Sequence, residues 1–238
     1  MALAAPPAGG RVLDVGCGTG VSTEAAQEAV GGGGLAVGVD MSLGMLSVGR
    51  KIRTGLRLAA AEAIDLPFRD ATFDAVISNF VIAHFPKYDT AFFDILRVLR
   101  PGGAFAVTAW GSNTDEFQKS WRQLAEEVAG QELLDDVFNQ VLPWEDLFAD
   151  RAGLEGALRD AGLHPVRVEQ REYRVQMSRE DYLAGRQSAV SGRFLRSMLG
   201  EEGWKPFMER VRAVFADRFP EQLTDFRDVN LAVGTKPK

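Results

Sequence analysis

The chain has 238 residues, of which 46% are hydrophobic and 25% charged, and this is an ordinary globular composition. Its length suits one α/β domain with insertions, or a domain with a cap. The net charge of −6 argues against a nucleic acid bound through a broad basic surface, and the single cysteine, Cys17, excludes an internal disulfide and a cysteine-based metal cluster.

The start of the chain and its apolar runs bear on where the protein resides. No apolar run reaches the roughly 18 residues of a membrane span. Residues 1–10 have no positive region, and their apolar stretch is too short for a signal peptide. We therefore expect a cytoplasmic protein with no membrane partner. No metal is expected either, and the oligomeric state stays open, with a homodimer as one option.

The first predicted strand, residues 12–15, carries Asp14 and runs directly into a turn with three alternate glycines, Gly16, Gly18 and Gly20. Glycine permits tight turns and leaves no Cβ between the backbone and a ligand. A helical pattern starts at once, and a helix N-terminus offers free N–H groups to an anion. Strand, glycine turn and helix together predict a small-molecule site.

Further elements follow in the order of an α/β sheet. The first helix covers about residues 20–30, with Val21, Ala25, Ala26 and Ala29 on one face and Thr23, Glu24, Gln27 and Glu28 on the other. A glycine run forms a loop, residues 35–39 a strand, and residues 42–53 a helix with Ser42 as its N-cap. The next predicted elements are the strands 56–60, 73–79 and 104–108 and a helix over 89–99.

The spacing of the glycines distinguishes between two kinds of ligand. A dinucleotide-binding turn reads G-x-G-x-x-G, but here position 21 is Val21 and the third glycine is Gly20. Asp40 closes the second strand, twenty positions after Gly20, where a carboxylate accepts hydrogen bonds from ribose hydroxyls. The pattern disfavours a nicotinamide oxidoreductase and favours a different nucleoside ligand.

The shorter turn, after a strand carrying Asp14, resembles motif I of the class I S-adenosylmethionine-dependent methyltransferases. Residues 60–68 resemble the family's adenine-side loop, residues 73–86 its motif IV and the turn after it, and residues 97–103 its helix-ending signature. The chain is most similar to the group with the ubiquinone-biosynthesis and sterol methyltransferases. The resemblance implies an α/β, doubly wound, Rossmann-like sheet of seven mostly parallel strands, the last antiparallel, with S-adenosylmethionine as cofactor.

The resemblance also implies a set of cofactor-binding residues. The backbone of the turn would take part at Gly16, Cys17, Gly18 and Gly20, followed by Asp40 and Met41, by Ala61 and Glu62 at the adenine, and by Asn79 at the methionine end. Asp14 would orient the turn or the cofactor ammonium, since a buried acid is costly without hydrogen bonds. The alternatives are a solvated Glu62, a backbone role alone for Asn79, and a Cys17 that is only a small side chain.

The second half of the chain departs from the family pattern. It predicts helices over about 115–129 and 132–148, the latter broken at Pro143, and a helix over 151–162. A strand over 166–177, a helical block over 178–219 and a strand over 225–235 follow. We predict a core of residues 1–111, 151–177 and 221–238, with helical inserts at 112–150 and 178–220 that form a substrate cap.

Only about ten residues precede the first strand, where the resembled family usually has one or two helices over the cofactor. An open pocket, closure by the inserts or by a second subunit, and a truncated chain are equally compatible with this start.

His84 is the candidate general base, because it lies in the turn after the fourth strand and an imidazole titrates near neutrality. The alternative is a histidine that caps the next helix or packs beside Phe85, and His164 is expected to be structural. Phe80 and Trp110 are the candidate acceptor-binding residues. A methyl transfer needs orientation more than a fixed catalytic dyad.

The leading hypothesis is a methyltransferase acting on a small, partly apolar molecule, with a hydroxyl or carboxyl of a secondary metabolite favoured over a nitrogen or carbon. An RNA or protein methyltransferase is the second, since Arg167, Arg171 and Arg174 cluster on one strand. The third is a non-catalytic cofactor-binding subunit.

Overall fold

A computed structural model describes residues 3–238, and the chain divides into two compact units. Unit 1 comprises Met1–Gly111, Trp144–Arg171 and Val229–Lys238, and unit 2 comprises Ser112–Pro143 and Glu172–Asp228. No helix within residues 3–238 is both long and apolar enough to cross a bilayer. In the same residues, no group of three or more His, Cys, Asp or Glu side chains is placed to hold a metal ion.

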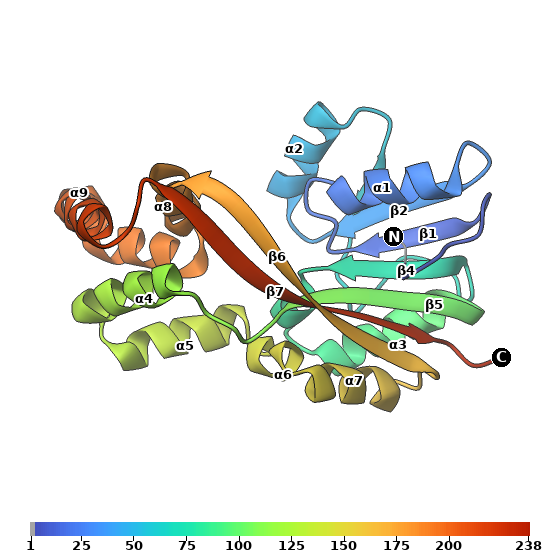
Figure 1. Ribbon diagram of the computed structural model, residues 1–238. Coiled ribbons are helices and arrows are strands. Elements are labelled where there is room, and N and C mark those ends of the chain that lie inside the picture. Colours follow the sequence, from blue (N-terminus) through green and yellow to red (C-terminus); the bar gives the residue numbers. More distant parts are fainter. Residues whose placement is uncertain (1–2) are drawn as a thin grey trace. The chain divides into compact units, whose positions relative to one another are not determined.

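Seven strands form one sheet in the order β3-β2-β1-β4-β5-β7-β6 (Figure 1). They are β1 (Arg11–Val15), β2 (Leu35–Asp40), β3 (Arg57–Ala60), β4 (Phe73–Asn79), β5 (Leu99–Trp110), β6 (Val166–Ser178) and β7 (Gln222–Thr235). Strands β1 to β5 pair in parallel, and β7 pairs antiparallel to β5. The expected doubly wound sheet with an antiparallel last strand is confirmed.

Helices cover both faces of the sheet in unit 1 (Figure 1). They are α1 (Val21–Val30), α2 (Leu43–Ile52), the short η1 (Ile82–His84), α3 (Tyr88–Val98), α6 (Glu145–Ala149) and α7 (Arg151–Asp160). Successive strand residues point to opposite faces. Leu13 therefore packs in the core under α3, α6 and α7, whereas its neighbour Val12 packs with Ala26 and Val30 of α1.

Helix α1 buries a different face from the expected one. Thr23, Ala26 and Val30 are buried, whereas Val21 is 60% exposed. Thr23 is on the buried face because its hydroxyl donates a hydrogen bond of 2.6 Å to the buried carboxylate of Asp14. The spacing of apolar residues in the sequence could not show that Thr23 has Asp14 as its partner.

Strand β5 begins five residues earlier than predicted, directly after α3 at Leu99. Leu99 pairs with Phe73 and Ala104 with Ala75, so the strand bulges between these two pairs. Gly102 has a φ of 80°, and its N–H donates to the carbonyl of Lys236. The glycines of the helix-ending signature at residues 97–103 therefore lie at a bulge inside the strand.

The boundaries of the inserts also differ from the expected ones. Residues 144–150, which the sequence placed in the first insert, belong to unit 1. Phe148 is fully buried in the sheet core, and the indole N–H of Trp144 donates to the carbonyl of Phe85. Conversely, residues 172–177 and 221–228, which were expected in the core, belong to unit 2.

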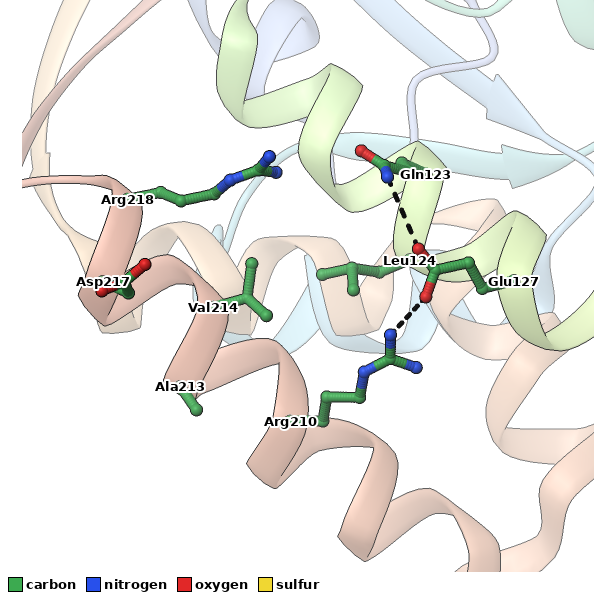
Figure 2. Close-up of a pocket in the computed structure, with 8 residues that line it drawn as sticks. All are labelled: Gln123, Leu124, Glu127, Arg210, Ala213, Val214, Asp217 and Arg218. Atoms are coloured by element: carbon green, nitrogen blue, oxygen red, sulfur yellow. Dashed lines mark hydrogen bonds and ion pairs between the residues drawn. The ribbon is translucent and has the colours of Figure 1, made fainter.

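Unit 2 contains four helices: α4 (Glu116–Ala129), α5 (Gln131–Val141), α8 (Arg179–Ser188) and α9 (Val190–Arg218), the last interrupted at Gly200. Trp121, from the aromatic-rich first insert, is 2% exposed and packs in this unit's core. A groove of about 380 Å³ is lined by α4 and α9 (Figure 2). Arg210 and Glu127 form an ion pair there, so their charges compensate each other. A capping function of the inserts stays a prediction.

Candidate functional site

The carboxyl ends of the five parallel strands meet at one edge of the sheet, where ligands bind in open α/β folds. The glycine turn follows β1, Asp40 ends β2, and Ala61 follows β3. Asn79 ends β4 and Trp110 ends β5. The expected cofactor and acceptor residues therefore all come from the ends of neighbouring strands.

The glycine turn has a backbone that only glycine adopts without strain. The φ angles of Gly16, Gly18 and Gly20 are 74°, 55° and 89°. A Cβ on Gly16 would lie 2.5 Å from Cγ1 of Val81, whereas a Cβ on Gly18 would meet only the tip of Met45, at 3.3 Å. The turn thus packs against the segment after β4 at Gly16 and leaves space above Gly18.

Asp40 ties the glycine turn to the end of β2. Its Oδ2 accepts the Gly18 N–H at 2.8 Å, and its Oδ1 accepts the Ser42 N–H at 2.8 Å. Each carboxylate oxygen has a further lone pair, which suits it to accept from ligand hydroxyls. Met41, the next residue, is 73% exposed beside it. Ser42 caps α2 through its hydroxyl, as predicted.

Asp14 is fully buried beneath the turn. Its Oδ2 accepts from the hydroxyls of Ser22 and Thr23, at 2.8 and 2.6 Å, so it fixes the first turn of α1. Its Oδ1 has no hydrogen-bond partner within residues 3–238, and burial raises the pKa of Asp14 to about 6. Because no part of it reaches the surface, the geometry favours orientation of the turn over direct contact with a cofactor ammonium.

This pKa predicts a pH-dependent stability. The folded protein holds the Asp14 proton more tightly than the unfolded chain, whose pKa is 3.8, so the contribution is greatest below pH 3.8 and is lost as pH rises through about 6. The loss is about 3 kcal/mol at most. Urea unfolding from pH 4 to 7 should show this slope in the wild type and not in Asp14→Asn. Equal slopes in Asp14→Asn and the wild type would contradict it, and exposed Asp136→Asn is the control.

Cys17 lies inside the turn but is buried, and it packs with Leu46 and Leu58. Burial raises the pKa of its thiol to about 12, so the thiolate nucleophile is absent near neutral pH. Cys17 thus serves as a small apolar side chain, and its N–H donates to the carbonyl of Val39.

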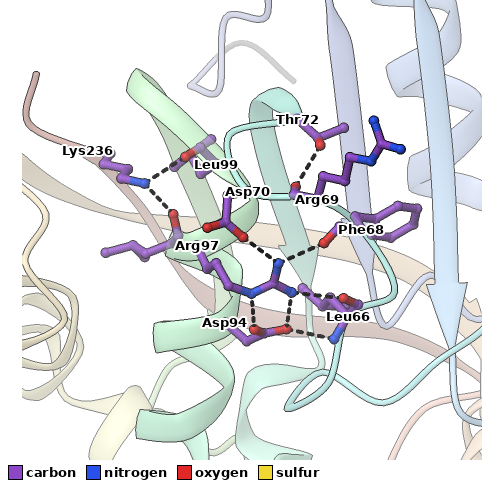
Figure 3. A network of polar contacts seen from close by, with 10 residues as sticks. Leu66, Phe68, Arg69, Asp70, Thr72, Asp94, Arg97, Leu99 and Lys236 are labelled. Atoms are coloured by element: carbon purple, nitrogen blue, oxygen red, sulfur yellow. Dashed lines mark hydrogen bonds and ion pairs between the residues drawn. The ribbon is translucent and has the colours of Figure 1, made fainter.

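A loop from Ala61 to Asp70 follows β3 and carries the expected adenine-side residues. The Ala61 N–H donates to the Asp40 carbonyl at 3.2 Å, and the exposed Glu62 forms a single bridge with Asp65. The loop is held from α3 by Arg97 (Figure 3). Its guanidinium donates hydrogen bonds to four residues, which are the carbonyls of Leu66 and Phe68 and the carboxylates of Asp70 and Asp94.

The Arg97 network predicts a large stability effect. Arg97→Ala leaves two loop carbonyls without their donor and the nearly buried Asp94 with only the Leu66 N–H, so we expect a loss of about 2–4 kcal/mol in the free energy of unfolding. Arg97→Lys should recover less than half, because an ammonium lacks the planar fork. Arg69→Ala, an exposed arginine in the same loop, is the control. Urea unfolding in which Arg97→Ala matches Arg69→Ala would refute this role.

Phe80 and Trp110 form a stacked aromatic pair, with ring centroids 4.2 Å apart and planes at 22°. Phe80 has a left-handed φ of 55°, and its N–H donates to the Thr108 hydroxyl. That hydroxyl donates in turn to Oδ1 of Asn79 at 2.6 Å. Thr108 therefore fixes the ends of β4 and β5. In the stacked aromatic pair, Trp110 is 45% exposed.

The two histidines lie at different edges of the sheet. His84 is exposed at the end of η1, in the segment that carries Phe80 and Val81, and its N–H donates to the Val81 carbonyl. The His164 N–H donates to the carbonyl of Thr235, which pairs with Ala104 near the amino end of β5. Only His84 lies near the candidate site.

Sequence reasoning missed four positioning residues: Ser22, Val81, Thr108 and Arg97 in its role as loop anchor. Ser22 stands in the first turn of a helix that follows a buried acid, and this was a usable signal. The other three hold partners that are 28 or more positions away in the sequence, namely Thr108 with Phe80, Arg97 with Phe68 and Val81 with Gly16, and these partners have no local signature.

Comparisons with known proteins point to one class of domain. Residues 13–107 match a family model described as a methyltransferase domain. This part of the chain, which contains the glycine turn and Asp40, is therefore similar to methyltransferase domains. Solved structures show the same fold over the chain. A putative methyltransferase from Bacillus halodurans has a TM-score of 0.64 at 17% identity, covering 100% of this chain and 97% of that one.

A further structural neighbour is phosphoethanolamine N-methyltransferase 2 of Haemonchus contortus, solved with S-adenosylhomocysteine. Its TM-score is 0.58 at 20% identity, and the match covers 100% of this chain and 51% of that one. Among curated sequences, the demethylmenaquinone methyltransferase of Renibacterium salmoninarum is 41% identical over 107 residues, which are 44% of this chain and 44% of that protein. The chain thus spans less than half the length of this curated relative.

Proposed function

We propose that the chain transfers the methyl group of S-adenosylmethionine to a small, partly apolar molecule. A hydroxyl or carboxyl of a secondary metabolite is favoured over a nitrogen or carbon acceptor. The observation that carries the proposal is the stacked pair of Phe80 and Trp110, with Trp110 half exposed at the end of β5. Val81 follows Phe80 and packs on Gly16, so the aromatic pair adjoins the glycine turn.

The residues present fit the cofactor. Asp40 offers two carboxylate oxygens for ribose hydroxyls, and the space above Gly18 admits a ligand close to the backbone. Asn79 has its Oδ1 engaged by Thr108, which holds its amide at the end of β4. When bound, the cofactor supplies an electrophilic methyl group on a sulfonium. The chain's own work is then to hold the acceptor in line and exclude water, and orientation supplies about 7–11 kcal/mol in favourable cases.

The curated relatives support an apolar acceptor, but only through the part of the chain that they match. The curated relative is named for demethylmenaquinone, a menaquinone precursor. The family match ends at residue 107, before both helical inserts. The residues that we expect to select the acceptor therefore lie mostly outside the matched part, and a different acceptor is compatible with the same cofactor half.

The arginines of β6 favour the small-molecule proposal over an RNA acceptor. Arg167 and Arg171 both contact Glu169, at 3.5 and 2.8 Å, and Arg174 contacts Glu172 at 2.6 Å. These paired charges leave little net positive potential for phosphates.

Two measurements test the proposal. Calorimetric titration with S-adenosylmethionine, S-adenosylhomocysteine and NADH should show binding of the first two only. Incubation with the methyl-labelled cofactor and a panel of phenols, carboxylic acids and amines should label hydroxyl or carboxyl compounds. Binding without label on any class of acceptor would instead favour a non-catalytic cofactor-binding subunit.

His84 gives the first mechanistic prediction. If it removes the proton of a hydroxyl acceptor, His84→Ala should lower turnover by about 10²–10⁴-fold and leave the Kd for S-adenosylhomocysteine nearly unchanged. The side chain is exposed, so folding should survive the change. His164→Ala, at the other edge of the sheet, is the matched control. Unchanged turnover in His84→Ala on the labelled acceptor would remove His84 from the mechanism.

A further inference from the structure

One segment of the chain has a charge balance opposite to that of the whole. The chain has 27 Lys and Arg against 33 Asp and Glu. Residues 41–61, which contain α2 and β3, hold four cations and no acid. The cations are Arg50, Lys51, Arg53 and Arg57.

The same segment exposes large apolar side chains. The exposed ones include Met41 at 73%, Leu43 at 69%, Met45 at 45%, Val48 at 46% and Ile52 at 61%. Met45, Val48 and Ile52 follow a three-and-four spacing, so they form one stripe along α2. The buried residues of the helix, Leu46 and Gly49, lie on the face next to it. The stripe itself is exposed in the part of the chain that the structure describes.

The cations are available to a partner as well. Arg50, Lys51 and Arg57 are exposed, and no carboxylate within residues 3–238 lies within 4.0 Å of them. Arg53 differs, because it pairs with Glu24 at 3.0 Å. Arg50 also donates a hydrogen bond to the Leu58 carbonyl at 2.8 Å. An acidic protein therefore presents, on the segment that carries the apolar stripe, three cations that form no ion pair within residues 3–238.

We propose that this α2 surface, consisting of Met45, Val48, Ile52, Arg50, Lys51 and Arg57, docks on an anionic lipid bilayer. An amphipathic helix with a cationic polar side lies in the membrane interface, with its apolar side chains among the acyl chains. Exposed lysines and arginines add attraction to anionic headgroups. The charge of the surface matches such a bilayer, whereas the rest of the chain would be repelled by it. If the surface docks in this way, the expectation that the protein has no membrane partner applies only to membrane-spanning segments.

Docking would place the candidate site close to a source of apolar molecules. Met45 touches the position above Gly18, and Met41 follows Asp40 directly. The inference goes beyond the proposed function, because docking requires neither the cofactor nor methyl transfer.

Vesicle co-sedimentation of the full chain tests the proposal. The probes are phosphatidylcholine vesicles with and without phosphatidylglycerol, at low and high salt. The wild type should pellet with the anionic vesicles at low salt and remain in solution with the neutral ones. The triple variant Arg50→Gln, Lys51→Gln, Arg57→Gln should lose on the order of 100-fold in partitioning. The double variant Val48→Gln, Ile52→Gln should lose at least about tenfold.

A matched control carries the same charge change elsewhere. Arg167→Gln, Arg171→Gln, Arg174→Gln removes three cations from β6, and it should partition like the wild type. A wild type that stays in solution with anionic vesicles overturns the proposal, as does a β6 control that loses as much as the α2 variant. Light scattering tests the alternative that the stripe binds a second copy of the chain. In that case the wild type is a dimer that does not bind lipid, and the Val48→Gln, Ile52→Gln variant is a monomer. This result would overturn the proposal.

Discussion

Gly16→Ala should abolish measurable binding of S-adenosylmethionine. The added Cβ would lie 2.5 and 2.6 Å from the two γ-carbons of Val81, and the φ of 74° is strained for any L side chain. Overpacking and strain together should lower the free energy of unfolding by about 2–4 kcal/mol. Relief of the clash requires the turn to separate from the segment after β4, so we expect a loss of cofactor affinity of at least about 100-fold.

Two variants separate the clash from other causes. Gly32→Ala has open space around its Cβ, and it should leave binding and stability near those of the wild type. Gly16→Ala combined with Val81→Ala removes the colliding γ-carbons, so calorimetry should show partial recovery of binding. A Gly16→Ala protein that binds the cofactor like Gly32→Ala would show that the turn is not the binding element.

Asp40→Ala has the second large expected effect. It removes the acceptor for the Gly18 and Ser42 N–H groups and the proposed acceptor for the ribose. Hydrogen bonds to a charged group contribute about 1.5–3 kcal/mol each, so we expect a comparable loss of stability and a loss of cofactor affinity on the order of 100-fold. Asp136→Ala, which removes an exposed carboxylate from α5, is the control.

The two functions of Asp40 are distinguishable with two ligands. Methylthioadenosine keeps the adenine and ribose of S-adenosylhomocysteine but lacks its amino-acid part. If Asp40 accepts from the ribose, Asp40→Ala should weaken both ligands by a similar factor. A loss confined to S-adenosylhomocysteine would mean that Asp40 acts only by holding the glycine turn.

The cofactor half of the fold was predictable because its signals are local. The glycines at 16, 18 and 20 require left-handed backbone, and Ser42 caps its helix through the neighbouring turn. The mostly parallel seven-stranded sheet with an antiparallel last strand followed from the resemblance to the family, and it is confirmed by the antiparallel pairing of β7 with β5. Phe80 and Trp110, chosen from two strand ends, stack on each other, and their contact with an acceptor stays a prediction.

The remainder depended on contacts between distant parts of the chain. Thr23 reads as a polar surface residue until its partner Asp14 is known. The insert boundary at Pro143 follows from burial of Phe148 under the sheet, and an amphipathic helix does not specify which core it joins. The Arg97 network uses backbone carbonyls of a loop, which have no sequence signal.

The division of the chain has a consequence for biosynthesis. Each unit is assembled from separate stretches, and the Val229–Lys238 stretch of unit 1 is synthesised after both stretches of unit 2. Until then β5 lacks its antiparallel neighbour from Ala104 to Trp110, and the nascent protein presents an open sheet edge next to a hydrophobic core. Unit 1 therefore completes its sheet only after unit 2 has been synthesised, and this interval is when chaperones would matter most.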